Sequence, residues 1–377
     1  MELTILKRDF VRGLARTHGV ADRKSSMPIL SNVLLTTQGN EGLRLSATDL
    51  YLGVSTVVPA KVKKGGTLAI SARTLFDVVK NLPDGEVELS VGENMATTLK
   101  AGKTRFKLPG LSGDDFPLLA NPGEAKFAEL DAELLMELIG LTSPSMSTDD
   151  TRPHLAGTLV EGEGDTIRMV TTDGHRLSKA EHRLKSDIAL AVRMLVPHKG
   201  ISELKKLLDD ARSTKAKDEG PVKVGVATVA GTAFFQRGEH VLTVKLADEQ
   251  FPPYARVIPQ QQTRRIVVAR VPMVEALRRI SLVASDKSSG VQLKIEPGTL
   301  RVQSQNPDVG EGVEELDVDY AGDALSIGFN ARYLLDALSA LSHDEIAIEL
   351  SGELDPGVLR PVGDGTDYVG VIMPMRI

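Results

Sequence analysis

The chain has 377 residues, too many for one compact core and enough for two or three domains. Its 45 Lys and Arg against 51 Asp and Glu give a formal net charge of −6, which excludes a general polycation but permits a local basic surface for nucleic acid. Cys is absent, so disulfides, thiolate metal sites and a Cys nucleophile are excluded, and a reducing, cytoplasmic setting is expected. No apolar run approaches the roughly 20 residues of a membrane span, so we expect no membrane partner.

A threefold repeat organises the chain. Apolar residues at helical spacing predict helices over 6–15, 130–141 and 271–283, and each helix leads into two strand-like runs joined by a turn. The predicted strand pairs are 29–37 with 43–47, 155–161 with 166–171, and 291–295 with 300–304. A recurring order of elements indicates one structural unit used several times.

The second half of each repeat recurs as well. Apolar strands that begin at Leu68, Leu190 and Leu325 each lead into a second predicted helix, and Ser71 and Asn330 are the expected N-caps. Further alternating strands follow in every repeat. Each unit is therefore predicted to pack two helices on antiparallel strands, which is an α+β fold. Residues 209–220 mix Lys with Asp and are predicted to form an exposed loop.

Two linkers mark the expected domain boundaries. Residues 110–117 and 248–253 both contain Phe-Pro, which favours an extended path because the residue before Pro avoids the helical region. We therefore expect similar domains at 1–122, 123–259 and 260–377.

Positive charge recurs on the predicted helices or beside them. Arg8, Arg12 and Arg16 form one stripe on the first helix, and other cations follow in the second and third units. An ordinary solvated face explains any single helix. Recurrence in all three units favours a shared basic surface that contacts phosphates without reading bases.

The most enzyme-like cluster is Thr172-Asp173-Gly174-His175-Arg176, because an Asp beside a His can serve acid–base catalysis. The corresponding corners, Thr48-Asp49 and Asn306-Pro307, lack this pair. A turn whose side-chain oxygen accepts bonds from its own backbone explains all three corners. No metal-ligand spacing of His and no phosphate-binding glycine loop occurs, so we expect no enzyme, no metal and no cofactor.

Several motifs together resemble one family over the whole chain: Met27-Pro-Ile-Leu-Ser-Asn32, the corner at 172–177, and the segments 251–257, 329–333 and 371–377. They are similar to the bacterial DNA polymerase III beta subunits, the sliding clamps. The resemblance implies three similar domains of the DNA-clamp type in each subunit and a head-to-tail homodimer that forms a ring. Such a ring encircles double-stranded DNA without sequence preference and tethers the replicative DNA polymerase, the clamp loader and repair proteins through short apolar peptide motifs.

The resemblance also implies site residues. The family's peptide pocket corresponds to one set from the second and third units: Leu155, Thr172, Gly174, His175, Arg176, Leu177, Pro252, Arg256, Val257, Asn330, Tyr333, Val371, Ile372, Met373, Pro374, Met375 and Arg376. Ser288 stands where some relatives have an aromatic residue, and 355–357 depart from the expected serine-rich turn.

Two further surfaces are expected. The DNA contacts are predicted at Lys24, Arg152 and Lys199, and the dimer interface where Phe106 packs on Leu282 and Val283 of the partner subunit. The alternative from another class is an intracellular three-repeat scaffold that binds peptides without touching DNA, and an enzyme based on Asp173 and His175 is a third.

Overall fold

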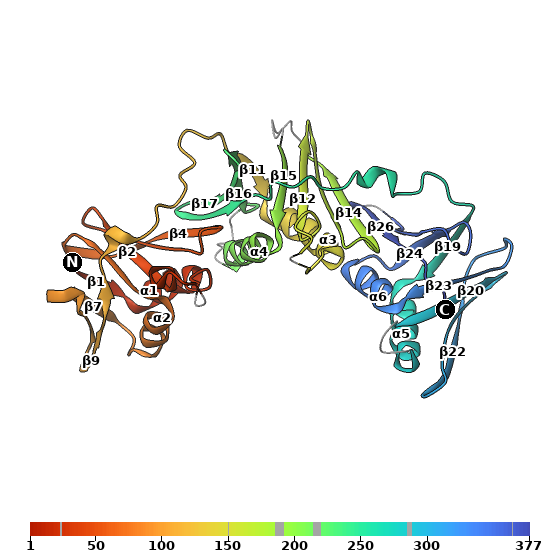
Figure 1. Cartoon of the computed structure of the whole chain (residues 1–377), viewed down its shortest axis with the longest axis horizontal. Coiled ribbons are helices and arrows are strands. Elements are labelled where there is room, and N and C mark those ends of the chain that lie inside the picture. Colours follow the sequence, from red (N-terminus) through yellow and green to blue (C-terminus); the bar gives the residue numbers. More distant parts are fainter. Residues whose placement is uncertain (23–24, 150, 185–191, 214–219, 285–288, 364) are drawn as a thin grey trace. The chain divides into compact units, whose positions relative to one another are not determined.

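The computed structural model describes residues 1–22, 25–149, 151–184, 192–213, 220–284, 289–363 and 365–377. Its contacts divide the chain into two compact units, Met1–Glu133 with Ser202–Leu246, and Leu134–Ile201 with Ala247–Ile377. Antiparallel sheets and α-helices build both units (Figure 1). The strands of the central repeat are shared between the two units, so each unit combines one terminal repeat with half of the central one.

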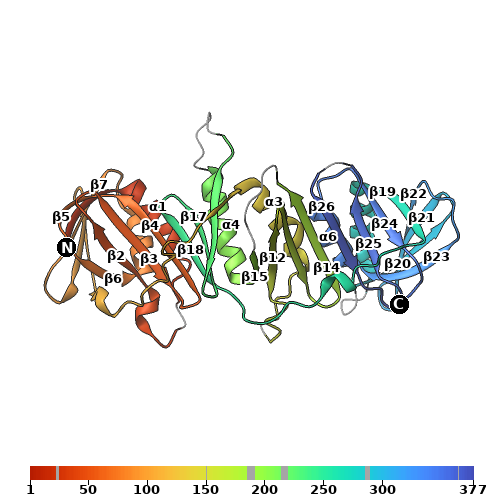
Figure 2. The same ribbon diagram turned by 90° about the horizontal axis from the view of Figure 1, so that it is seen from above.

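Two antiparallel sheets form the first unit. The larger has nine strands in the order β10-β6-β2-β3-β4-β18-β17-β16-β11, and Figure 2 shows β4 of the first repeat close to β18 of the central one. The smaller has five, in the order β5-β1-β7-β8-β9. The bounds are β1 Glu2–Leu6, β2 Asn32–Gln38, β3 Gly42–Thr48, β4 Leu52–Pro59, β5 Lys61–Lys64, β6 Thr67–Ser71, β7 Glu86–Val91, β8 Thr97–Ala101, β9 Thr104–Leu108, β10 Gly110–Leu111, β11 Ala128–Asp131, β16 Lys223–Val229, β17 Thr232–Arg237 and β18 His240–Lys245.

Helices α1 (Lys7–Thr17) and α2 (Ala72–Asn81) pack together in this unit. Phe10 and Leu14 of α1 are fully buried, as their helical spacing predicts. Gly13 lies so close to the sheet that a Cβ there would meet Leu45 and Val58 at 3.0 Å, so a larger residue would push the helix away.

The second unit also has two sheets. Eight strands run in the order β15-β12-β13-β14-β26-β25-β24-β19, and four in the order β22-β21-β20-β23. The bounds are β12 Gly157–Glu163, β13 Thr166–Thr172, β14 Arg176–Arg183, β15 Val192–Pro197, β19 Arg264–Ala269, β20 Gly290–Glu296, β21 Thr299–Asn306, β22 Gly310–Asp317, β23 Leu325–Asn330, β24 Glu345–Leu350, β25 Gly357–Pro361 and β26 Asp367–Ile372.

Helices α5 (Arg270–Ile280) and α6 (Ala331–Ala340) pack together in this unit through apolar faces that include Leu277 and Leu334. The two remaining helices, α3 (Ala132–Thr142) and α4 (His198–Ser213), each contain a boundary between the units. No helix among the described residues is long and apolar enough to cross a membrane.

The local predictions can be compared with these elements. The threefold order of helix, strand pair and second helix is confirmed, and both expected N-caps accept a backbone bond, Ser71 Oγ from Thr74 N at 3.4 Å and Asn330 Oδ1 from Arg332 N at 2.9 Å. Two expectations are wrong. Residues 29–31 belong to a 3₁₀ turn (Pro28–Ser31), because Pro28 favours a helical start, and β2 begins only at Asn32. Helix α4 occupies 209–213 of the predicted loop, because Leu207, Leu208 and Ala211 keep a buried face. Residues 214–219 of that loop, and the predicted strand start at Leu190, lie outside the described residues.

Candidate functional site

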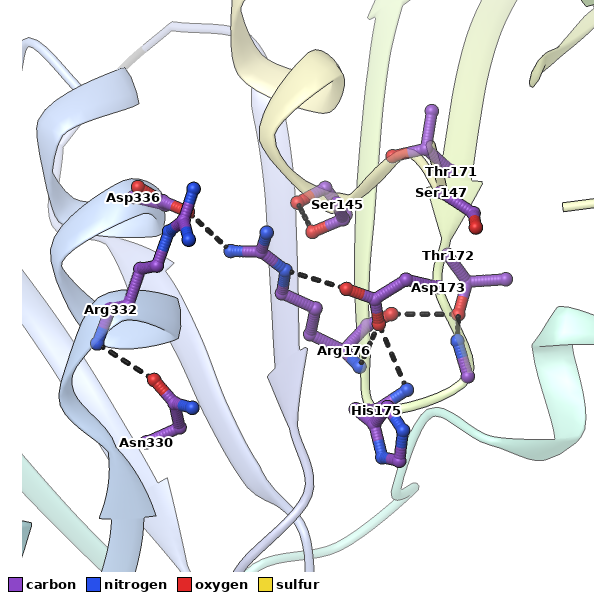
Figure 3. Close-up of polar contacts among 12 residues, drawn as sticks. Ser145, Ser147, Thr171, Thr172, Asp173, His175, Arg176, Asn330, Arg332 and Asp336 are labelled. Carbon is purple, nitrogen blue, oxygen red and sulfur yellow. Dashed lines mark hydrogen bonds and ion pairs between the residues drawn. The ribbon is translucent and has the colours of Figure 1, made fainter. Parts of the chain in front are cut away.

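The corner between β13 and β14 folds on its own side chains. The Asp173 carboxylate accepts from the backbone N–H groups of His175 and Arg176 at 2.9 and 3.0 Å, and Thr172 Oγ1 donates to the Arg176 carbonyl at 2.7 Å (Figure 3). Gly174 takes a φ of +93°, which glycine adopts without strain. The predicted turn is thus confirmed, and it leaves His175 exposed at its tip.

The other two corners fold in the same way. Asp49 accepts from the backbone of Tyr51 and Leu52 at 2.9 and 2.6 Å, and Asn306 accepts from Asp308 N at 3.0 Å. The shared turn therefore explains why an Asp stands at position 173, beside His175.

Arg176 joins this corner to helix α6. Its Nε donates to Asp173 Oδ2 at 3.0 Å and its Nη1 to Asp336 Oδ2 at 2.7 Å (Figure 3). Its guanidinium also lies 4.3 Å from the centroid of the Tyr333 ring. The Arg176 side chain is only 12 % exposed, so these charge-assisted bonds and the cation–π contact fix it in one position. Tyr333 and Asp336 are three residues apart and therefore share one face of α6.

The C-terminal segment passes between the corner and β23. Met373 N donates to the His175 carbonyl and Met375 N to the Gly328 carbonyl, both at 2.9 Å. A Cβ at Gly328 would collide with the carbonyl oxygen of Met375, so only glycine allows this approach. Val371 and Ile372 are buried in β26, whereas Met373 is 40 % exposed.

The linker after β18 borders the same surface. Phe251 is buried in a cluster with Leu177 and Val371, and Tyr254 packs against that cluster. The 3₁₀ turn η5 (Tyr254–Arg256) follows, and it leaves Arg256 and Val257 exposed.

Leu155 is buried, and its N–H donates to the carbonyl of Arg152 at 2.9 Å. Arg152 Nη1 in turn donates to the Asp173 carbonyl at 3.1 Å. Hydrogen bonds and apolar contacts thus connect every part of the expected peptide set, which combines a buried apolar base with exposed Met373, Val257 and cationic side chains.

The expected DNA contacts differ in their surroundings. Lys24 lies outside the described residues, as does Ser288, and Lys199 is exposed in the first turn of α4. Arg152 Nε donates to Asp149 Oδ2 at 2.9 Å, so a phosphate would compete with Asp149 and with the Asp173 carbonyl. Bonds from Thr151 and Arg152 hold the pKa of Asp149 below its usual value.

Of the expected interface residues, Phe106 and Leu282 are exposed and Val283 is half-buried. Phe106 is 39 % exposed on β9, the edge of the five-stranded sheet, and Leu282 is 78 % exposed in the 3₁₀ turn Ser281–Val283.

Sequence reasoning missed several residues that build this region. Asp336 binds Arg176 across 160 positions of sequence, and Tyr254 binds Glu161 across 93. The spacing of Tyr333 and Asp336 on one helix face was the available signal for the contact of Arg176 with Asp336. No local pattern indicates the contact of Tyr254 with Glu161. No group of three or more His, Asp or Glu within the described ranges has a geometry that could hold a metal ion.

Comparison with known proteins gives a consistent result. Models of the N-terminal, central and C-terminal domains of the DNA polymerase III beta subunit match residues 1–120, 129–253 and 255–376. The chain is 34 % identical to the beta sliding clamp of Caulobacter vibrioides and 35 % identical to that of Pseudomonas putida, each match covering 100 % of both chains.

Solved structures give the same result. The DNA polymerase III subunit beta of Pseudomonas aeruginosa is similar with a TM-score of 0.91 at 33 % identity, and the beta sliding clamp of Caulobacter crescentus with 0.92 at 32 %, both over 100 % of each chain. A Pseudomonas aeruginosa clamp bound to griselimycin is similar with a TM-score of 0.91 at 34 % identity, again over the full length of both. The chain therefore belongs to the DNA polymerase III beta subunit family of sliding clamps.

Proposed function

We propose that this protein is a DNA sliding clamp, a ring that encircles duplex DNA and tethers the replicative polymerase and other partners for processive synthesis, without being an enzyme itself. The observation that carries the proposal is the match of three clamp domains and of the complete fold over the full length of the chain. A topological link holds DNA without base contacts, so the ring can slide while it stays bound, and weak, screened phosphate contacts suit that task. We keep 1–122, 123–259 and 260–377 as the proposed domain boundaries.

Edge strands of opposite charge support ring closure by two copies. Strand β9 at the edge of the five-stranded sheet carries Arg105 and Lys107, and β22 at the edge of the four-stranded sheet carries Glu311 and Asp317. Pairing of β9 with the β22 of a second copy would satisfy both edges and bring opposite charges together. Because such a contact is head-to-tail, it forms a closed ring when the rotation between copies fits. Phe106, Leu282 and Val283 are the apolar residues that we propose for this seam.

The connected surface around Arg176 is the proposed docking site for partner peptides. Buried Leu155, Leu177, Val371 and Ile372 give it a fixed base. Exposed Met373 adds a thioether that adapts its shape to different apolar side chains. The polymerase, the clamp loader and repair proteins would each bind this site through a short peptide. They would therefore compete with one another for it. We propose Lys24, Arg152 and Lys199 for the DNA face, with the smallest contribution from Arg152 because its bonds are already used.

Retention on DNA tests the function. The protein, assembled on closed circular duplex, should stay bound through gel filtration and should dissociate when one restriction cut linearises the circle. Equal retention on circular and linear DNA would overturn the ring. Charge reversal at Lys199 should reduce assembly on DNA several-fold and leave griselimycin binding unchanged, whereas unchanged assembly would favour a peptide-binding scaffold without DNA contact.

A further inference from the structure

A ladder of alternating charge crosses the eight-stranded sheet beside the second linker. Arg193, Glu161, Arg168 and Glu181 stand directly opposite one another on β15, β12, β13 and β14. Arg168 Nε donates to Glu181 Oε2 at 2.6 Å, and the Arg193 and Arg168 guanidinium groups lie 3.4 and 3.5 Å from Glu161. Opposite charges in cross-strand pairs support one another, so the ladder presents a fixed set of donors and acceptors to the linker.

Tyr254 attaches the linker to this ladder. Its hydroxyl donates to Glu161 Oε2 at 2.7 Å and accepts from Arg168 Nη1 at 3.4 Å, while its ring meets Phe251 edge-on with centroids 6.3 Å apart. Burial raises the pKa of Tyr254 and the bond to Glu161 raises it further, so the phenol keeps its proton and remains a donor at neutral pH.

The backbone around Tyr254 transmits this attachment to the proposed docking site. Tyr254 N donates to the Pro252 carbonyl at 2.7 Å, and Val257 N donates to the Tyr254 carbonyl at 3.0 Å. Pro252 and Val257 therefore belong to one compact turn. The contacts that hold the Tyr254 side chain also hold this turn in place. Arg256 and Val257 are themselves exposed, so the phenol is the polar anchor of the turn.

The first linker provides an internal comparison, because it also contains Phe-Pro, and a similar segment follows that pair. Leu119 stands three residues after Phe116, as Tyr254 stands three after Phe251. Arg44 stands five residues before Asp49, as Arg168 stands five before Asp173, but its cross-strand neighbours are the uncharged Thr36 and Val57. Arg44 instead lies 3.8 Å from Glu239, so the first linker has no phenol and no run of alternating charge across neighbouring strands. Both linkers border a cavity, of about 580 Å³ in the first unit and about 450 Å³ in the second.

We propose that Tyr254, held by Glu161 and Arg168, is a positioning residue that pre-organises the turn 252–257 for ligand binding. The proposal rests on the proposed function of the same surface. The ladder is partly exposed, and such ion pairs contribute little to global stability. A turn held in its bound conformation before the ligand arrives nevertheless improves affinity, because less ordering is needed on binding.

The test uses the full-length protein and griselimycin as the probe in calorimetric titrations. Tyr254→Phe removes only the hydroxyl and should weaken binding roughly threefold to tenfold, because the hydrogen bond orders the turn and does not contact the ligand, so only part of its free energy reaches the affinity. Tyr320→Phe is the matched control, because it also removes one phenol bond, from Tyr320 to the Asp323 carbonyl at 2.7 Å, and it should bind like the wild type. Thermal unfolding and retention on circular DNA should be the same for both variants.

Further variants separate positioning from a general loss of structure. Glu161→Gln should weaken binding, and adding it to Tyr254→Phe should cost less than the sum of the two single changes. Arg168→Lys should retain more affinity than Arg168→Gln. Equal affinity of Tyr254→Phe and Tyr320→Phe would overturn the positioning role alone, whereas a wild-type protein that does not bind griselimycin would overturn the proposed docking site itself.

Discussion

Both linkers contain a Phe-Pro pair, yet the residues that follow each pair make different contacts with the sheet. In the first unit, Leu119 lies against the sheet so closely that a Cβ at Gly53 would meet it at 2.9 Å, and polar side chains such as Ser46 and Ser55 line the cavity beside it. In the second unit, Tyr254 packs on an apolar cluster and bonds a charged ladder. The two repeats thus share one framework, and the residues on the sheet beside each linker decide whether a hydrogen bond to a charged side chain holds the turn.

The largest expected effect concerns the C-terminal segment, which lies only beside the second linker. Deletion of 373–377 removes the backbone bonds of Met373 to His175 and of Met375 to Gly328. Griselimycin affinity should fall about a thousandfold or more, equivalent to ~4 kcal/mol, because the docking surface loses one wall. Titration measures the loss, and native mass spectrometry should still show a dimer.

Removal of Ile377 alone is the control, because both backbone bonds remain, and most of the affinity should persist. Loss of the dimer after the larger deletion would mean that residues 373–377 also belong to the subunit interface, which contradicts the proposed assignment.

The second expected effect is a loss of stability at acid pH in the first unit. His240 in the first unit is 7 % exposed, and burial together with the positive charges of Arg16, Arg12 and Arg237 lowers its pKa from 6.5 to about 4, despite Asp210 nearby. Between these values the unfolded chain binds a proton that the folded chain does not, so stability falls as pH drops from 6.5 towards 4, by about 3 kcal/mol in all.

Melting curves between pH 4.5 and 7.5 measure this dependence. His240→Gln should flatten the decrease below pH 6.5, whereas the exposed His175→Gln should not alter it. The same slope in all three proteins would assign the acid sensitivity to other groups.

The smallest expected effect on affinity comes from exchanging the residue types of Tyr254 and Leu119 between the two linkers. Tyr254→Leu should weaken griselimycin binding about tenfold, because it removes the phenol and part of the ring packing. Leu119→Tyr, just after the first linker, should change the affinity less than about twofold, because Leu119 lies in the first unit and the proposed docking site lies in the second. Comparable losses from both changes would show that the linkers contribute equally.

The sequence predicted most of the features that depend on neighbours along the chain, although the start of β2 and the end of α4 were wrong. Helical spacing placed α1 and α5, Ser71 and Asn330 were recognised as caps, and the three self-bonded corners followed from Asp49, Asp173 and Asn306. Resemblance to the family, rather than any local pattern, assembled the docking residues.

What the sequence did not predict depends on long-range contacts. Pairing of β4 with β18 and of β14 with β26 joins different repeats in one sheet, and no periodicity indicates which edges meet. The partners of Arg176 and Tyr254 lie 160 and 93 residues away and were therefore missed as well.

Hydrogen–deuterium exchange with and without griselimycin tests the difference between the linkers most directly. The account predicts protection in 172–177, 252–258 and 371–376, where the corner, the anchored turn and the C-terminal segment meet, and unchanged exchange in 113–122. Equal protection of both linkers, or protection of the first alone, would contradict it.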